Sequence, residues 1–224
     1  MAKYEKPDFW SLKAQKEGYP ARSVYKLMEI DEKFNFFKSA RQAGKPNSGS
    51  LRVLDLGAAP GSWSLYVLRK YGTASKNLKG FFLAAADLLP LPENPELQNR
   101  KDFFFIQADF TGSLARNELA RHGPYNAIIC DAAPPTTGSR TVDTQRSLTL
   151  AEEAISLAIS GADNSSSQVY LTPGGNLAVK VFQGGGTADL LKHLREFFTS
   201  VKSFKPEACR SSSFETYLLG IGKR

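Results

Sequence analysis

Short apolar runs alternate with helical patterns along this chain of 224 residues, and this alternation limits its fold more than any other feature. The runs, each of a length suited to one strand, are Leu51–Leu56, Phe81–Ala86, Phe103–Gln107, Ala127–Cys130 and Leu177–Phe182. The spacing of apolar residues predicts helices at Arg22–Phe34, Ser62–Tyr71, Leu114–Arg121, Val142–Ile159 and Ala188–Ser200, the last with Thr187 as its N-cap. Strands that alternate with helices and are apolar on both faces are typical of a parallel sheet with helices on both sides.

The C-terminal end of the chain breaks this alternation. Two strand candidates, Val201–Lys205 and Thr216–Ile221, follow each other without a helix between them and should pair antiparallel. The whole pattern predicts an α/β fold with a mostly parallel seven-stranded sheet that ends in an antiparallel hairpin. This arrangement resembles the Rossmann-like fold of S-adenosylmethionine (SAM) methyltransferases. We expect a single domain over residues 1–224, in which residues 1–21 form a partly mobile appendage and residues 44–50 form a loop.

Composition excludes several classes of protein. The longest mostly apolar stretches, Gly80–Leu91 and Tyr125–Ala133, are far shorter than the ~20 residues that a membrane span needs. The N-terminus has no apolar signal-peptide core, and two cysteines with two histidines suffice neither for a disulfide framework nor for an apparent zinc site. We therefore expect a cytoplasmic protein without a metal ion. Nothing in the sequence indicates a dimer interface, so a monomer is the default.

Positive charge is concentrated at the two ends of the chain. The formal net charge of +7 divides into +4 over residues 1–45, −1 over residues 46–191 and +4 over residues 192–224. The N-terminal part also places aromatic residues between its cations. Cations neutralise phosphates and aromatic rings stack on unpaired bases, so this mixture favours RNA over a small metabolite as the partner. The alternative is a solvated basic surface whose aromatic residues belong to the core.

The segment Val53–Trp63 predicts a strand, a turn of small residues and the start of a helix. In open α/β sheets a ligand binds beyond the carboxyl ends of the strands, and a small residue such as Gly57 lets the backbone approach it closely. The pattern after Gly57 departs from the G-x-G-x-x-G of dinucleotide-binding folds, and Pro60 removes an amide that a phosphate could use. This favours SAM, which has no phosphate, over NAD. A purely structural turn is the alternative.

Three acidic residues follow at the ends of later strand candidates: Asp87, Asp109 and Asp131. A carboxylate at such a position can accept hydrogen bonds from ribose hydroxyls or an adenine amine, or pair with the methionine ammonium. Any one of them could equally cap a helix or face solvent in a loop. The three in succession after the turn favour a cofactor site.

Together with the segment Val53–Trp63, five further motifs resemble the FtsJ-like RNA 2′-O-methyltransferases, over residues from about 23 to the C-terminus. The motifs are Asp87-Leu-Leu-Pro90, Ala108-Asp-Phe110, Cys130-Asp-Ala-Ala-Pro134, Pro173-Gly-Gly175 and Val179-Lys-Val-Phe-Gln-Gly184. The resemblance is greatest to the bacterial members that act on the large ribosomal subunit. It implies SAM-dependent methylation of a ribose 2′-hydroxyl, at a uridine in the A-loop of 23S ribosomal RNA.

The resemblance also assigns roles to individual residues. The Lys-Asp-Lys-Glu tetrad of the family corresponds here to Lys26, Asp131, Lys180 and Glu215. The SAM contacts of the family correspond to Gly61, Trp63, Asp87, Asp109 and Asp131. Without the resemblance, Lys26 and Glu215 would be read as surface residues and Trp63 as a packing residue.

Methyl transfer to a ribose requires that the 2′-oxygen be held in line with the donor methyl group and lose its proton. A lysine accepts a proton only when neutral, which at an ordinary pKa near 10.4 is true of roughly one molecule in 2,500 at pH 7. A second lysine and burial would lower that pKa, whereas two carboxylates would oppose the shift. We hypothesise that Lys180 accepts the proton, that Lys26 and Asp131 orient the hydroxyl and the amine, and that Glu215 holds Lys180 in place.

The chain departs from the family pattern in three places. Asp131-Ala-Ala-Pro-Pro135 replaces Asp-Met-Ala-Pro-Asn, Arg210-Ser-Ser-Ser-Phe214 replaces an arginine-rich stretch, and Gly18–Ser23 retains only part of a basic segment. None of these departures changes the tetrad, so they bear on the substrate rather than on the chemistry. One alternative keeps the chemistry and changes the substrate to a tRNA or an mRNA cap. Two others change the function: a ribosome-assembly factor that binds SAM and RNA without turnover, and a small-molecule methyltransferase or NAD-dependent enzyme.

Overall fold

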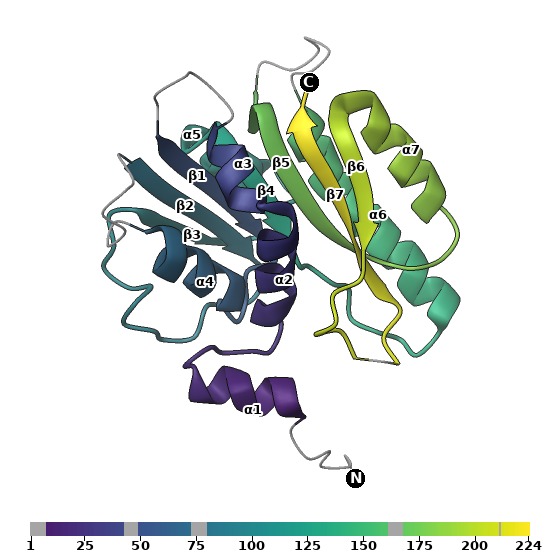
Figure 1. Ribbon diagram of the computed structural model, residues 1–224, viewed down its shortest axis with the longest axis horizontal. Helices are drawn as coiled ribbons and strands as arrows, with labels where there is room; N and C mark the ends of the chain where they lie inside the picture. The colour runs from purple at the N-terminus through teal and green to yellow at the C-terminus, as the bar shows by residue number, and fades with distance from the viewer. Residues whose placement is uncertain (1–7, 43–48, 73–79, 161–167, 211) are drawn as a thin grey trace.

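The computed structural model describes residues 8–42, 49–72, 80–160, 168–210 and 212–224. Seven strands form one sheet in the order β3-β2-β1-β4-β5-β7-β6 (Figure 1). The strands are β1 (Ser50–Leu56), β2 (Gly80–Asp87), β3 (Phe103–Gln107), β4 (Tyr125–Cys130), β5 (Leu171–Phe182), β6 (Phe198–Phe204) and β7 (Glu215–Lys223). β1 to β5 are parallel, and β7 is antiparallel to both β5 and β6. The predicted mostly parallel sheet with a C-terminal antiparallel pair is confirmed.

Helices cover both faces of the sheet. They are α1 (Phe9–Lys16), α2 (Val24–Phe34), α3 (Phe36–Gln42), α4 (Ser62–Tyr71), α5 (Ser113–Arg121), α6 (Arg140–Ile159) and α7 (Thr187–Phe197). Buried apolar side chains of α2, α3 and α4 share one core cluster with one face of the sheet. Those of α5, α6 and α7 share a second cluster with the other face. Figure 1 shows α2 and α3 in front of the sheet and α6 behind it.

The carboxyl ends of the parallel strands meet at one edge of the sheet, at the bottom of Figure 1. Because β7 runs antiparallel to β5, its first residue, Glu215, pairs with Phe182 at the end of β5. Residues that end β1, β2, β4 and β5 and residues that begin β7 therefore share this edge. Within the described ranges, the structure contains no helix long and apolar enough to cross a membrane.

The predicted helix Ala188–Ser200 is too long at its C-terminal end. α7 ends at Phe197, and Phe198 already belongs to β6, where it pairs with Lys223 of β7. Residues 198–200 thus complete the edge of the sheet, and this long-range pairing overrides the helical spacing of the preceding residues. Thr187, predicted as the N-cap, is instead the first helical residue, and Gly186 with φ of 89° occupies the cap position.

Two elements extend beyond what the sequence pattern indicates. β5 begins at Leu171, six residues before the predicted strand, because its backbone already pairs with β4 there, across a register shift. The prediction missed this part because Pro173, Gly174 and Gly175 interrupt the apolar run. α3 forms a separate helix because Asn35 adopts a left-handed conformation with φ of 48° that ends α2. The predicted loop 44–50 lies mostly outside the described residues.

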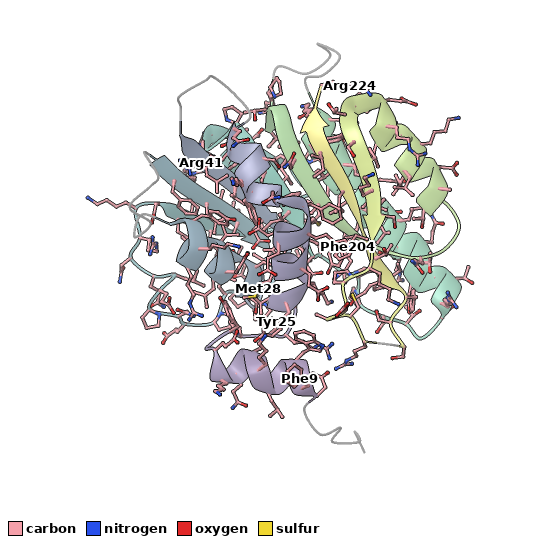
Figure 2. The ribbon with its side chains drawn as sticks, viewed as in Figure 1. Phe9, Tyr25, Met28, Arg41, Phe204 and Arg224 are labelled. Atoms are coloured by element: carbon pink, nitrogen blue, oxygen red, sulfur yellow. The ribbon has the colours of Figure 1, made fainter. Side chains whose placement is uncertain are left out.

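The described part of the predicted appendage, residues 8–21, is packed against α2. Trp10 of α1 lies 5.0 Å from Tyr25 of α2 between ring centroids, and Phe9 lies 5.3 Å from Trp10. Figure 2 labels Phe9 and Tyr25 at this junction. The backbone amide of Ala21 also donates to the hydroxyl of Ser62, at the start of α4, at 2.7 Å. This segment therefore contacts both helices next to the carboxyl edge of the sheet.

Candidate active site

The turn between β1 and α4 packs tightly against the segment that follows β4. Gly57 has φ of 75°, and a Cβ placed on it would lie 2.5 Å from the Cβ of Ala132. Only glycine fits this position, because any side chain would collide with the backbone of the neighbouring loop. Beside the turn is a cavity of about 110 Å³. Its lining comprises Gly57, Asp87, Leu88, Ala108, Asp109, Phe110, Ala132, Ala133 and Leu150.

Two of the predicted cofactor acids, Asp87 and Asp109, line this cavity. The carboxylate of Asp87 accepts hydrogen bonds from the amides of Ala59 and Leu89, both at 2.8 Å. One oxygen of Asp109 accepts from the amide and the hydroxyl of Thr111, at 2.9 and 2.8 Å. Both acids thus stabilise loops, and each carboxylate retains lone pairs for a ligand.

The other two predicted cofactor residues of the turn, Gly61 and Trp63, are not among the residues that line the cavity. Gly61 is the N-cap of α4, with φ of 99°. Trp63 is 2 % exposed, and its indole nitrogen donates to the carbonyl of Ser23 at 2.8 Å. The side chain of Trp63 therefore ties α4 to the residue before α2, which matches its alternative reading as a packing residue. Its contact with a cofactor stays a prediction.

The four residues of the predicted tetrad converge from four elements. Pairing of β5 with β7 sets Lys180 opposite Tyr217 and Phe182 opposite Glu215. The side chains of these two pairs, including the tetrad residues Lys180 and Glu215, therefore lie on one face of the sheet. α2 packs on that same face and contributes Lys26, while Asp131 directly follows β4. Strand register and helix packing thus bring together residues that lie up to 189 positions apart in the chain.

These four residues form two ion pairs. The amine of Lys26 lies 2.6 Å from a carboxylate oxygen of Glu215, and the amine of Lys180 lies 2.9 Å from Oδ1 of Asp131. Lys180 also donates to the backbone carbonyl of Asp131. The expectation that Glu215 holds Lys180 is therefore wrong: Glu215 holds Lys26, because α2 brings that amine to the start of β7.

Tyr217 is a site residue that the sequence reasoning missed. Its hydroxyl donates to Oδ1 of Asp131 at 2.6 Å, the same oxygen that contacts Lys180. Its ring is fully buried, with its centroid 5.7 Å from that of Trp63. The available signal was the two-residue spacing from Glu215, since residues two apart on a strand share a face.

Burial and charge act in opposite directions on the ionisable groups. Burial lowers the pKa of Lys26, but the charges of Asp131 and Glu215 outweigh it, so the net direction is upward. Burial raises the pKa of Asp131, but Lys180 and Lys26 bring it below its usual range. Burial and the nearby Asp131 raise the pKa of Tyr217 well above 10, which keeps its hydroxyl protonated. Lys26 is therefore an ammonium and Asp131 a carboxylate at neutral pH.

An opening of about 420 Å³ leads to one of the two ion pairs. It is lined by Ala21, Arg22, Ser23, Lys26, Arg210, Ser212, Ser213 and Glu215. The cofactor-type cavity and this opening lie on different parts of the carboxyl edge, the first near β1 and β2 and the second between α2 and β7. A donor bound in the first and an acceptor entering by the second would meet near Asp131 and Lys180.

The residues beside the first cavity fit SAM. The turn lacks a phosphate-binding pattern, and the carboxylates of Asp87 and Asp109 at the cavity retain lone pairs that could accept hydrogen bonds from a nucleoside. Leu88, which is 67 % exposed, offers an apolar surface at the cavity. Small residues, acids and an exposed apolar side chain are compatible with an adenosine that carries an amino-acid tail.

Comparison with known proteins agrees with this geometry. The family model of FtsJ-like methyltransferases matches residues 19–223. The protein named ribosomal RNA large subunit methyltransferase E of Treponema denticola is 47% identical over 219 residues, which cover 98% of this chain and 96% of the relative. The protein of the same name from Oleidesulfovibrio alaskensis is 39% identical, with 99% of this chain and 93% of the relative covered.

A solved structure from Plasmodium falciparum, described as that of a ribosomal RNA methyltransferase, superposes with a TM-score of 0.67. The two sequences are 25% identical, and the match covers 92% of this chain and 98% of the other. The family model and the relatives span almost the whole chain, including every residue of the two ion pairs. This chain belongs to the FtsJ-like methyltransferase family.

Proposed function

We propose that this protein transfers a methyl group from SAM to the 2′-hydroxyl of a ribose in RNA of the large ribosomal subunit, at a uridine in the A-loop of 23S ribosomal RNA. The observation that carries the proposal is the two ion pairs, Lys26–Glu215 and Lys180–Asp131, at the same edge of the sheet as the cavity that Asp87 and Asp109 line. The names of the relatives support large-subunit RNA as the substrate.

When bound, SAM supplies an electrophilic methyl group on a sulfonium. Asp87 and Asp109 would accept hydrogen bonds from the polar groups of its adenosine, and Gly57 would let the backbone approach it. The exposed side chain of Leu88 would supply an apolar surface for the base. Gly61 and Trp63 shape the wall behind the turn, because the first begins α4 and the second anchors that helix to Ser23.

Lys180 accepts the proton of the attacking 2′-hydroxyl. Its amine has a fixed position, since it contacts both Oδ1 and the backbone carbonyl of Asp131. Lys26 is less suited to this step, because the neighbouring carboxylates raise its pKa and keep it charged. In this proposal Lys180 acts as the base and the ammonium of Lys26 acts as a hydrogen-bond donor.

Lys26 and Glu215 position the ribose. Both line the opening between α2 and the start of β7, through which an RNA strand reaches the site. As an ammonium, Lys26 donates a hydrogen bond to a ribose oxygen, and Glu215 fixes the direction of that donor at 2.6 Å. Alignment of the 2′-oxygen with the methyl group contributes several kcal/mol to catalysis.

We further propose that the chain acts as a single domain and as a monomer, in the cytoplasm where ribosomes assemble. The strands of the one sheet contribute side chains to both core clusters, which supports a single folding unit.

The test is transfer of radiolabelled methyl groups from SAM to undermethylated large subunits, free ribosomal RNA and tRNA. The variant Lys180→Ala removes the base, and Lys202→Ala, an exposed lysine of β6, is the matched control. We expect label on ribose in large-subunit RNA with the wild type and the control. In Lys180→Ala we expect a loss of at least 100-fold, within the range usual for a general base, with SAM binding retained.

Other outcomes identify the alternatives. Label on tRNA alone would keep the mechanism and change the substrate. Tight SAM binding with no label on any RNA would contradict the enzymatic proposal and favour a ribosome-assembly factor.

A further inference from the structure

We propose that Phe214, Phe182 and Arg140 form a stacking subsite for a base of the RNA next to the methylated nucleotide. This inference rests on the proposed function, and it adds a specificity element outside the two ion pairs. The three residues are here called the aromatic–arginine cluster.

The cluster is built from three segments that each also carry a residue of the ion pairs. Phe182 lies two residues after Lys180 on β5, Phe214 directly precedes Glu215, and Arg140 begins α6 after the loop that starts at Asp131. All three segments end or begin at the carboxyl edge of the sheet. The cluster therefore borders the reaction site.

The contacts within the cluster make a cation–aromatic surface. The rings of Phe182 and Phe214 meet edge to face with centroids 4.8 Å apart, and the guanidinium carbon of Arg140 lies 5.3 Å from the centroid of Phe214. The amide of Gln183 donates to the carbonyl of Phe214 at 2.8 Å, which ties the two strands together at this point. Phe214 is thus held in place before any ligand arrives.

Exposure distinguishes the cluster from a core contact. Phe182 is 9 % exposed and anchors the group, whereas Phe214 is half-buried and Arg140 is exposed. Among the ion pairs found in the described residues, Arg140 takes no part. Its charge is therefore available to a phosphate, and the ring and guanidinium together suit the face of an unpaired base.

The position of the cluster along the sheet indicates which part of the substrate it meets. The cavity assigned to SAM is lined from the loops after β1, β2, β3 and β4 and by Leu150 of α6, whereas the two rings of the cluster lie at the ends of β5 and β7, beyond β4. A ribose at Lys180 would have the cofactor on one side and the cluster on the other. The group that reaches the cluster is then a base of the RNA rather than the adenine of SAM.

The experiment compares Phe214→Leu and Phe214→Tyr in methyl transfer to undermethylated large subunits, with SAM binding and subunit binding measured separately. Phe204→Leu is the matched control, because Phe204 also lies below a cation, with Lys33 4.5 Å from its ring, but on the other side of β7. Stacking on one base predicts that Phe214→Leu raises KM for subunits about 10-fold, with kcat and SAM affinity nearly unchanged. Phe214→Tyr should retain wild-type KM, and Arg140→Gln should raise KM about 5-fold.

Equal KM values for Phe214→Leu and the wild type would overturn the proposal, as would parallel losses of SAM binding and kcat, which would show a structural role. The two proposals fail separately. If the wild type binds subunits, Phe214→Leu weakens that binding and no methyl group is transferred, the subsite stands and the proposed reaction fails.

Discussion

At the scale of single residues, one carboxylate oxygen of Asp131 connects two other groups of the site. Oδ1 of Asp131 contacts the amine of Lys180 and accepts the hydroxyl hydrogen of Tyr217. With a depressed pKa, Asp131 remains charged and holds both partners. The hydroxyl of Tyr217 thus limits where the carboxylate can lie, and the carboxylate in turn limits where the Lys180 amine can lie.

Replacing Tyr217 with phenylalanine removes this restraint without changing the packing of the ring. We expect kcat for methyl transfer to fall about tenfold, because a hydrogen bond to a charged group contributes about 1.5 kcal/mol. SAM affinity should change little. The matched control is Tyr125→Phe, which removes another buried hydroxyl with a 2.6 Å hydrogen bond, to the carbonyl of Leu119. An equal loss of kcat in both variants would show that Tyr217 acts only through stability.

At the scale of elements, α2 is the helix that carries Lys26 into the site, and it is fixed at both ends. Before its first turn, the carbonyl of Ser23 accepts the indole hydrogen of Trp63. In its third turn, buried Asp31 accepts the hydroxyl hydrogens of Tyr66 and Tyr71 at 2.7 Å each. It also pairs with Lys70 at 2.9 Å. The partners Trp63, Tyr66, Lys70 and Tyr71 all belong to α4, so these contacts connect the helix after the cofactor turn to the helix that carries Lys26.

Replacing Asp31 with alanine should lower the free energy of unfolding by about 3 kcal/mol, because the hydroxyls of Tyr66 and Tyr71 and the amine of Lys70 lose their acceptor. For a chain of this length that corresponds to a decrease in Tm of about 10 °C. Thermal unfolding followed by circular dichroism measures it. Glu32→Ala, at the exposed neighbouring position of the same helix, should change Tm by less than about 2 °C. A similar small effect for Asp31→Ala would contradict the assigned role.

At the scale of the whole molecule, one buried acid at the centre of the sheet makes stability depend on pH. Asp55 of β1 is fully buried, and its Oδ2 accepts from the hydroxyl of Ser64 at 2.7 Å. Within the described residues its other oxygen has no hydrogen-bond partner. Burial raises its pKa from 3.8 to about 7. The folded protein therefore keeps the proton of Asp55 up to about pH 7, whereas the unfolded chain loses it near pH 4.

Because the folded state binds more protons in this window, stability falls as pH rises from about 4 to about 7 and is constant above that. We expect Asp55 to contribute a decrease of about 2 kcal/mol between pH 5.5 and 7.5, measured by urea unfolding at both pH values. His122 opposes this trend, since burial lowers its pKa. Asp55→Asn should therefore remove the decrease. Equal pH dependence in wild type and variant would contradict the assignment.

The elements of the fold were readable from the sequence, because each depends on local patterns. The runs that became β1 to β4 are apolar over four to six residues, and the helices between them have regular spacing. Where two signals compete the prediction was wrong: residues 198–200 continue the helical spacing of α7 but belong to β6. The first half of β5 contains proline and glycines and gave no strand signal.

The sequence predicted which residues form the site but not which of them pair with each other. The motifs named Lys26, Asp131, Lys180 and Glu215, and all four meet at one edge of the sheet. That Glu215 holds Lys26 rather than Lys180, and that Tyr217 shares an oxygen of Asp131, depends on strand register and on the angle at which α2 packs. Local sequence patterns predict neither the strand register nor the packing angle of α2. The sequence by itself determined the succession of strands and helices along the chain and the residue types at their ends, because periodicity and turn chemistry act over a few neighbouring residues. Only the tertiary structure decided which charges pair, because contacts between β5, β7 and α2 join residues that are distant in the chain.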